Sequence, residues 1–153
     1  MDERPVLEAK FLLGIEHIDR QHRGLFEILG RVHDALLAND FSAGPTISRS
    51  VRELLEYTNE HFSSEEATMK AEGYPALDEH RALHHHLLAK VRDIEIRAEF
   101  EAQFGPAELA EFLYSWLADH ILTEDMAFGE FCRNTKRGKV GDPAVANTTG
   151  LET

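Results

Sequence analysis

Apolar residues recur every three or four positions along four long segments of the chain, which is the period of an amphipathic α-helix. The pattern predicts helices near residues 19–38, 46–71, 76–100 and 107–132. Helix-breaking residues separate these segments at Asn39 to Pro45, at Gly73-Tyr74-Pro75 and at Gly105-Pro106, and β-hairpin signals are absent. We therefore expect an all-α fold, an up-down-up-down antiparallel four-helix bundle.

The chain of 153 residues is about the size of one domain. We expect the bundle to occupy residues 1–133, with an N-terminal arm of about residues 1–17. Residues 134–153 are rich in Gly, Thr, Asn and Lys, which predicts a flexible C-terminal tail.

Histidine interrupts the apolar face of every predicted helix. The interrupting residues are His22 in the first helix, His61 and Glu65 in the second, His80 and His84 in the third, and His120 in the fourth, where the same line runs through Leu113, Trp116 and Ala127. An antiparallel arrangement brings the polar residues to one end of the bundle. Because burying unpartnered imidazoles costs about 1–3 kcal/mol each, metal coordination is the favoured explanation.

The residue types restrict the kind of metal site. Imidazole nitrogens with carboxylate oxygens suit iron, copper, zinc or nickel, and a single cysteine, Cys132, cannot build a thiolate-rich site. Five histidines and a carboxylate exceed the four ligands of a tetrahedral zinc, so two metals are expected. The Glu-x-x-His motif of ferritin-like bundles is absent, since Asp19 before His22 is the nearest approach to it.

Several short motifs follow one another in a fixed order. They are Gly14-Ile15 with Ile18-Asp19-Arg20-Gln21-His22, then His61-Phe62-Ser63-Ser64-Glu65-Glu66 with Met69 and Gly73-Tyr74-Pro75, then His80-x-x-x-His84, then Trp116-Leu117-Ala118-Asp119-His120-Ile121 with Asp125. From about residue 11 to 131 the chain in this way resembles the hemerythrins, in their bacterial single-domain form. The resemblance implies a four-helix bundle that binds O2 reversibly at a non-haem di-iron centre.

The resemblance also implies which residues bind each of two iron ions. His80, His84 and His120 would bind one iron, His22 and His61 the other, and Glu65 and Asp125 would bridge the pair together with an oxo or hydroxo group. O2 would bind at the open position of the iron with two histidines. The implied role is O2 storage, delivery or sensing rather than catalysis.

Helix geometry and the resemblance disagree about one ligand. Glu124 is four residues after His120 and would share its helical face, whereas Asp125 is five residues after it. The resemblance selects Asp125, which requires a locally widened turn such as a π-bulge. For the other bridging carboxylate, geometry and resemblance both select Glu65 over Glu66.

Apolar residues next to the ligands are expected to shield bound O2 from water, although each is also compatible with an ordinary core position. They are Leu25, Phe62, Trp116, Leu117 and Ile121. Where the family usually carries a tryptophan in the N-terminal arm, this chain has Leu7, with Phe11 nearby. The remaining histidines, His17, His33, His85 and His86, are expected on the solvated surface.

Charge bears on partners and location. Sixteen basic against 28 acidic residues leave a formal charge of −12 with no basic stripe, which disfavours binding to nucleic acid or to a membrane surface. Without a signal-peptide pattern or a long apolar run, a cytoplasmic protein is expected. O2 is the expected partner, and an O2-consuming protein could be a second one. The alternatives are a di-iron enzyme, such as a peroxidase or a nitric oxide or O2 reductase, and an iron buffer.

Overall fold

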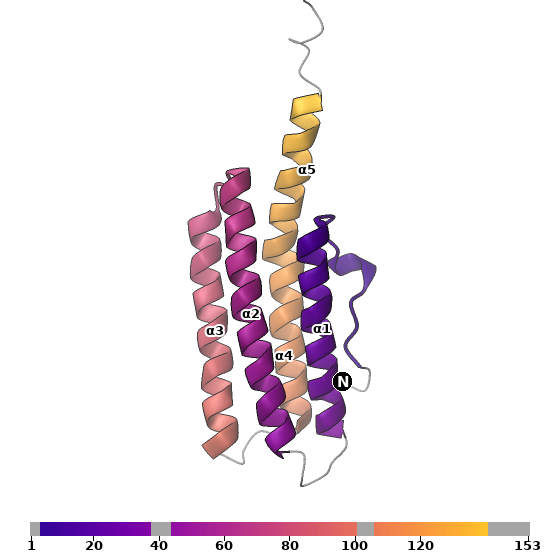
Figure 1. Ribbon diagram of the computed structural model, residues 1–153, viewed down its shortest axis with the longest axis vertical. Helices are drawn as coiled ribbons and strands as arrows, with labels where there is room; N and C mark the ends of the chain where they lie inside the picture. Colours follow the sequence, from indigo (N-terminus) through magenta and orange to yellow (C-terminus); the bar gives the residue numbers. More distant parts are fainter. Residues whose placement is uncertain (1–3, 38–43, 101–105, 141–153) are drawn as a thin grey trace, which may run out of the picture.

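Four antiparallel helical columns form the body of the protein (Figure 1). The computed structural model describes residues 4–37, 44–100 and 106–140. Its helices are the short 3-10 turn η1 (Ala9–Phe11), α1 (Glu16–Leu37), α2 (Gly44–Glu72), α3 (Leu77–Phe100), α4 (Pro106–His120), the π-helical turn η3 (Ile121–Asp125) and α5 (Met126–Val140). The expected all-α, up-down-up-down bundle is confirmed. Among the described residues no helix is long and apolar enough to cross a membrane.

The fourth column is longer than expected. The elements α4, η3 and α5 follow one another without a break, and α5 extends beyond the ends of the other three columns (Figure 1). The helix therefore passes the boundary expected between residues 133 and 134 and continues to Val140. Residues 137–140 have no apolar periodicity, but they continue a helix that is already formed, which is easier than starting one. The rest of the expected tail, residues 141–153, lies outside the described residues.

The turn between α2 and α3 shows why Gly73 stands where it does. Its φ of 69° lies in the left-handed region, which glycine adopts without strain. The amide of Gly73 donates to the carbonyl of Lys70 and the amide of Tyr74 donates to that of Met69. This pair of bonds is a Schellman motif, which satisfies carbonyls at the end of α2. The motif reverses the direction of the chain within a short turn, so that the end of α2 and the start of α3 lie side by side.

The N-terminal arm lies along α1 and is attached to it by Asp19. The carboxylate of Asp19 accepts hydrogen bonds from the amides of Leu13, at 2.7 Å, and Gly14, at 3.0 Å. Phe11 is fully buried, with its ring centroid 4.9 Å from that of Phe26. An aromatic residue of the arm thus packs on the bundle, although the arm lacks the tryptophan that the resemblance to hemerythrins led us to look for. The helix α1 begins at Glu16, so it includes the last residues of the expected arm.

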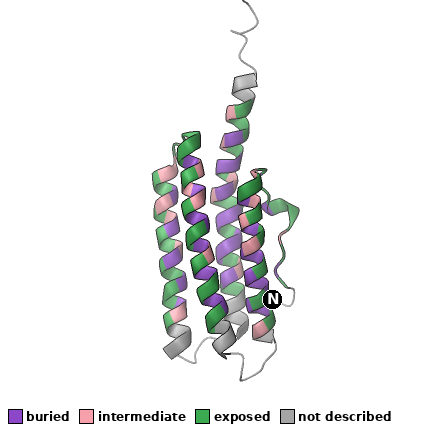
Figure 2. Cartoon of the chain, viewed as in Figure 1, coloured by how far each residue is buried: buried purple, intermediate pink, exposed green. Residues whose placement is uncertain are grey.

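Buried residues lie along all four columns of the bundle (Figure 2). One histidine departs from expectation, because His33 is only 2% exposed rather than solvated. It follows Phe26 and Gly30 along a second face of α1, and the Arg4 guanidinium of the arm lies directly against Gly30. The sequence pattern identified one apolar line on α1, whereas the arm and the bundle together cover a wider face.

We predict that Asp19→Asn weakens the attachment of the arm. An amide oxygen accepts a hydrogen bond less strongly than a carboxylate, and one of the two acceptors becomes a donor, so the free energy of unfolding should fall by about 1–2 kcal/mol. Urea unfolding of the metal-free chain measures the change. Glu16→Gln, at an exposed site on the same turn of α1, is the matched control. An equal loss in both variants would show that removal of charge, and not the bonds to Leu13 and Gly14, is responsible.

Candidate metal centre

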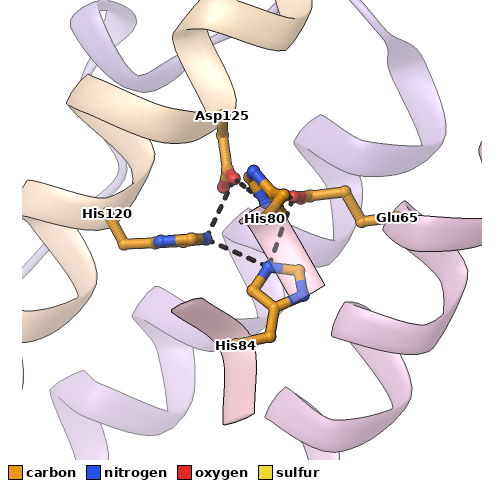
Figure 3. A group of neighbouring side chains, drawn as sticks. All are labelled: Glu65, His80, His84, His120 and Asp125. Carbon is orange, nitrogen blue, oxygen red and sulfur yellow. Dashed lines mark hydrogen bonds and ion pairs between the residues drawn. The ribbon is translucent and has the colours of Figure 1, made fainter. Parts of the chain in front are cut away.

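Seven histidine and carboxylate side chains converge inside the bundle, at the end nearer the α2–α3 turn. Each is at most 6% exposed, and five of them are drawn in Figure 3. They are His22 from α1, His61 and Glu65 from α2, His80 and His84 from α3, His120 from α4, and Asp125 from η3. The structure therefore brings together every residue that the sequence analysis named as a metal ligand.

The seven side chains fall into two overlapping groups whose ligand atoms lie within 4.8 Å of one another. We call them the three-histidine group, which is His80, His84 and His120 with Glu65 and Asp125, and the two-histidine group, which is His22 and His61 with the same two carboxylates. Both carboxylates belong to both groups, so each lies where it could bridge two ions. The division of the histidines is the one that the hemerythrin resemblance implied.

Asp125 reaches the centre because η3 is a π-helical turn. Residues five apart would lie about 140° apart on a regular α-helix, but the wider turn brings Asp125 round to the face of His120. Its Oδ1 is 3.1 Å from Nε2 of His120, and its Oδ2 is 3.1 Å from Nε2 of His22. Asp125 is fully buried, whereas Glu124 is partly exposed.

The same turn displaces the residues that follow it by one position. Ala127, which was expected on the buried line of the fourth helix, is exposed, and Phe128 is fully buried in its place. The expectation assumed 3.6 residues per turn throughout, and η3 inserts one extra residue into that count. Phe128 then packs against Tyr74 of the α2–α3 turn, with ring centroids 5.1 Å apart.

Glu65 lies between the two groups in the same way. Its Oε1 is 2.7 Å from Nε2 of His80, and its Oε2 is 3.2 Å from Nε2 of His61 on the same helix. The spacing of four residues between His61 and Glu65 places both on the inner face of α2. The neighbouring Glu66 is partly exposed and points away from the shared space.

The geometry of the donor atoms fits metal ions better than direct hydrogen bonds. Oε2 of Glu65 and both carboxylate oxygens of Asp125 are buried and accept no hydrogen bond, although imidazole nitrogens lie close to them. The Nε2 atoms of His22 and His61 are 3.1 Å apart. Two nitrogens held at right angles about 2.1 Å from one ion would be about 3.0 Å apart.

Another pair of imidazoles has the same spacing, since Nε2 of His84 is 3.1 Å from Nε2 of His120. The lone pairs of these nitrogens and the unpaired carboxylate oxygens therefore point into common spaces within the bundle. Donors of this chemistry, nitrogen and oxygen without thiolate, suit iron, zinc or copper.

Two further side chains hold the imidazoles from outside, and the sequence analysis did not assign them this role. Nδ1 of His61 donates to Oε1 of Gln21 at 2.7 Å, and Nδ1 of His84 donates to Oε1 of Glu66 at 2.9 Å. A proton on Nδ1 leaves the Nε2 lone pair free to bind a metal. Both contacts cross from one helix to another, so no spacing within a single helix could have revealed them.

Burial and close contact shift the pKa values in the centre. Burial alone would lower the pKa of His22, but Asp125 and Glu65 raise it to about 9, and the same balance raises the pKa of His80 to about 9. Burial lowers the pKa of His61. Burial and the neighbouring Glu65 would raise the pKa of Asp125, but the imidazoles lower it to about 2. Without metal, therefore, some of the histidines are cationic at neutral pH and both carboxylates are anionic.

The residues expected to shield bound O2 are all buried. Leu25 and Ile121 have no exposed surface, and Phe62, Leu117 and Trp116 are at most 7% exposed. Phe62 stacks flat on His84, with ring centroids 3.6 Å apart, and its centroid is 5.8 Å from that of His61. This one aromatic ring therefore contacts a histidine of each group.

The other histidines lie apart from the two groups. His85 and His86 are exposed on α3, as expected, and His17 is exposed and bonded to Thr68. The seven residues from His80 to His86 thus contain two buried and two exposed histidines. Cys132 lies buried inside α5.

Comparison with known proteins gives one consistent answer. The family model described as the hemerythrin HHE cation binding domain matches residues 13–132, which include all seven convergent residues. A bacteriohemerythrin of Clostridium acetobutylicum is 33% identical over 126 residues, covering 80% of this chain and 97% of that protein. One of Pseudomonas aeruginosa is 30% identical over 129 residues, covering 84% and 82%. A solved structure of wild-type hemerythrin is similar with a TM-score of 0.70 and 27% identity, covering 80% of this chain and 92% of that one.

We predict that Asp125→Asn abolishes stable binding at both groups, whereas Glu124→Gln leaves binding intact. Asp125 contributes an anionic oxygen to each group, and Glu124 contributes to neither. Metal per chain after anaerobic loading and desalting is the measurement, with circular dichroism as the control for folding. Equal metal content in the two variants would place the carboxylate ligand elsewhere.

A second prediction concerns pH. Because the pKa values of His22 and His80 are raised to about 9, an entering ion must displace their protons at neutral pH. Apparent Co(II) affinity should therefore keep rising from pH 7 to pH 9, by up to about a hundredfold per pH unit while two protons are displaced. Competition with a chelator of known pH dependence measures it. A plateau above about pH 7.5, as for ordinary histidines, would contradict the prediction.

The stability of the metal-free chain should follow the opposite trend over the same range. The contribution of a raised histidine pKa is fully present below the unfolded value of about 6.5 and is lost as the pH rises through the folded value. The free energy of unfolding of the metal-free chain should therefore fall between pH 6.5 and pH 9. Measuring it tests independently whether His22 and His80 carry protons at neutral pH.

Proposed function

Because this chain belongs to the hemerythrin family, whose domain binds cations, we propose that it binds O2 reversibly at two iron ions. His80, His84 and His120 would hold one ion and His22 and His61 the other, with Glu65 and Asp125 shared between them together with an oxo or hydroxo bridge. The relatives named bacteriohemerythrin and myohemerythrin support this reading.

One observation carries the proposal, namely that two groups of unequal size share both of their carboxylates. Sharing keeps two ions close enough to act on one small molecule. The inequality leaves the ion of the two-histidine group with fewer protein ligands, and so with room for O2. A site for a single structural ion needs neither feature, since its ligands close around one centre.

The iron ions would supply the electrons and the open coordination position on which O2 binding depends. The protein supplies the rest. Gln21 and Glu66 keep the proton on Nδ1 of His61 and His84, so that each Nε2 stays directed at the centre. Buried apolar residues exclude water, and with it the protons that would turn a reversible step into an irreversible one. We assign this shielding role to Leu25, Phe62, Trp116, Leu117 and Ile121.

The biological use that we propose is O2 storage, delivery or sensing in the cytoplasm, with delivery directed to an O2-consuming partner protein. This function differs from that of a di-iron peroxidase or reductase in one measurable respect. A carrier returns O2 unchanged when the gas is removed, whereas an enzyme consumes it.

The test is a cycle of loading and degassing. The chain is loaded anaerobically with Fe(II), exposed to O2, and then degassed while its visible absorption is followed. We expect two iron ions per chain and an absorption band that appears with O2 and disappears when O2 is removed, over repeated cycles. Chain loaded with Zn(II), which does not change oxidation state, is the control and should show no band.

Three results would overturn the proposal. Steady O2 consumption with loss of the band would identify an enzyme, and iron uptake without any O2-dependent band would identify an iron buffer. Binding of a single zinc ion in preference to iron would exclude a di-iron centre altogether.

A further inference from the structure

The two groups differ in the charge of the side chain that accepts the Nδ1 hydrogen bond of a histidine from outside the group. In the three-histidine group, the outer partner of His84 is a carboxylate, Glu66, at 2.9 Å. In the two-histidine group, the outer partner of His61 is a neutral amide, Gln21, at 2.7 Å. The bonds are of similar length and both fix the same tautomer, so the difference between them is charge.

Glu66 is well placed to act on the three-histidine group. It follows Glu65 on α2, and Nε of Arg81 on α3 lies 3.7 Å from its second oxygen. Its side chain is 22% exposed, which leaves it partly shielded from water. Phe62 stacks flat on the face of His84 and shields the ring that lies between Glu66 and the centre.

Gln21 occupies the corresponding place beside the two-histidine group. Its amide nitrogen donates to the hydroxyl of Ser64 at 3.0 Å, which orients the amide oxygen toward His61. The remaining histidine of that group, His22, has a buried Nδ1 without a hydrogen-bond partner. Neither histidine of the two-histidine group therefore has an anionic outer partner.

An anion that accepts the Nδ1 proton of a metal-bound imidazole makes the imidazole a stronger electron donor through Nε2, and a neutral amide does so less. We propose that Glu66 is a positioning residue that makes the two metal positions unequal. An ion in the three-histidine group, where the outer partner is Glu66, binds more tightly and is oxidised at a lower potential than an ion in the two-histidine group, where the outer partner is Gln21. Arg81 moderates this effect by partly neutralising Glu66. The proposal rests on the di-iron function but concerns the electronics of each position and not O2 itself.

Site-resolved metal binding provides the first test. Crystals of the wild type, Glu66→Gln and Gln21→Glu are equilibrated with limiting Co(II) in a metal buffer, and anomalous diffraction gives the occupancy of each position. Glu66→Gln should weaken the three-histidine position by about 10- to 100-fold and leave the two-histidine position unchanged. Gln21→Glu should strengthen the two-histidine position. Glu56→Gln, an exposed site on the same helix, removes the same charge and should change neither.

The second test uses potentials, which a purely structural role would not move in a defined direction. In a potentiometric titration of the iron-loaded chain, the first oxidation should shift to a more positive potential in Glu66→Gln. In Arg81→Gln it should shift to a more negative potential, because the carboxylate of Glu66 is no longer neutralised. Opposite shifts from two neighbouring substitutions are the signature of charge.

The outcomes separate this inference from the proposed function. If Glu66→Gln lowers occupancy at both positions equally, or if Glu66→Gln and Arg81→Gln shift the potential in the same direction, the inference is wrong even when O2 binds reversibly. If the occupancies and potentials change as described but no O2 adduct forms in the wild type, the inference holds and the O2-binding function fails.

Discussion

Two carboxylates buried in the middle of a helical bundle, those of Glu65 and Asp125, impose the condition that the rest of the structure meets. Moving a carboxylate out of water into a protein interior costs several kcal/mol unless partners compensate for it. Here the compensation comes from five imidazoles on four columns, and the contacts are short enough to hold both carboxylates anionic. The bundle therefore depends on arranging the helices so that these groups meet at one level.

The arrangement requires each column to contribute at the correct height and rotation. The tight α2–α3 turn at Gly73 brings the end of one helix beside the start of the next, which places His61 and Glu65 opposite His80 and His84. The fourth column must contribute two residues, His120 and Asp125, and a regular helix would direct them about 140° apart. The π-helical turn η3 resolves this conflict at the metal centre itself.

A difference in charge distinguishes two halves that otherwise resemble one another. Both groups use the same two carboxylates, and both fix an imidazole from outside by a hydrogen bond to Nδ1. Glu66 is anionic and Gln21 is neutral, so the halves are chemically unequal even before the number of histidines is counted. If O2 binds at one of two ions, as proposed, this inequality helps to decide which ion takes it.

The helices and the inward histidines could be predicted from the sequence because helical periodicity is local: a polar residue on an apolar line is visible within one segment. Asp125 could be named only through family resemblance, since spacing alone favoured Glu124. Three features escaped prediction. The burial of His33 and the hydrogen bonds of Gln21 and Glu66 belong to the packing of segments against one another, and the exchange of Ala127 for Phe128 follows from the extra residue that η3 inserts into the helical count. The sequence by itself determined the four helical segments and the histidines that interrupt their apolar lines. Only the tertiary structure decided how these side chains divide into two groups and which outer charge each group has, because both properties arise from contacts between helices that no single helix contains.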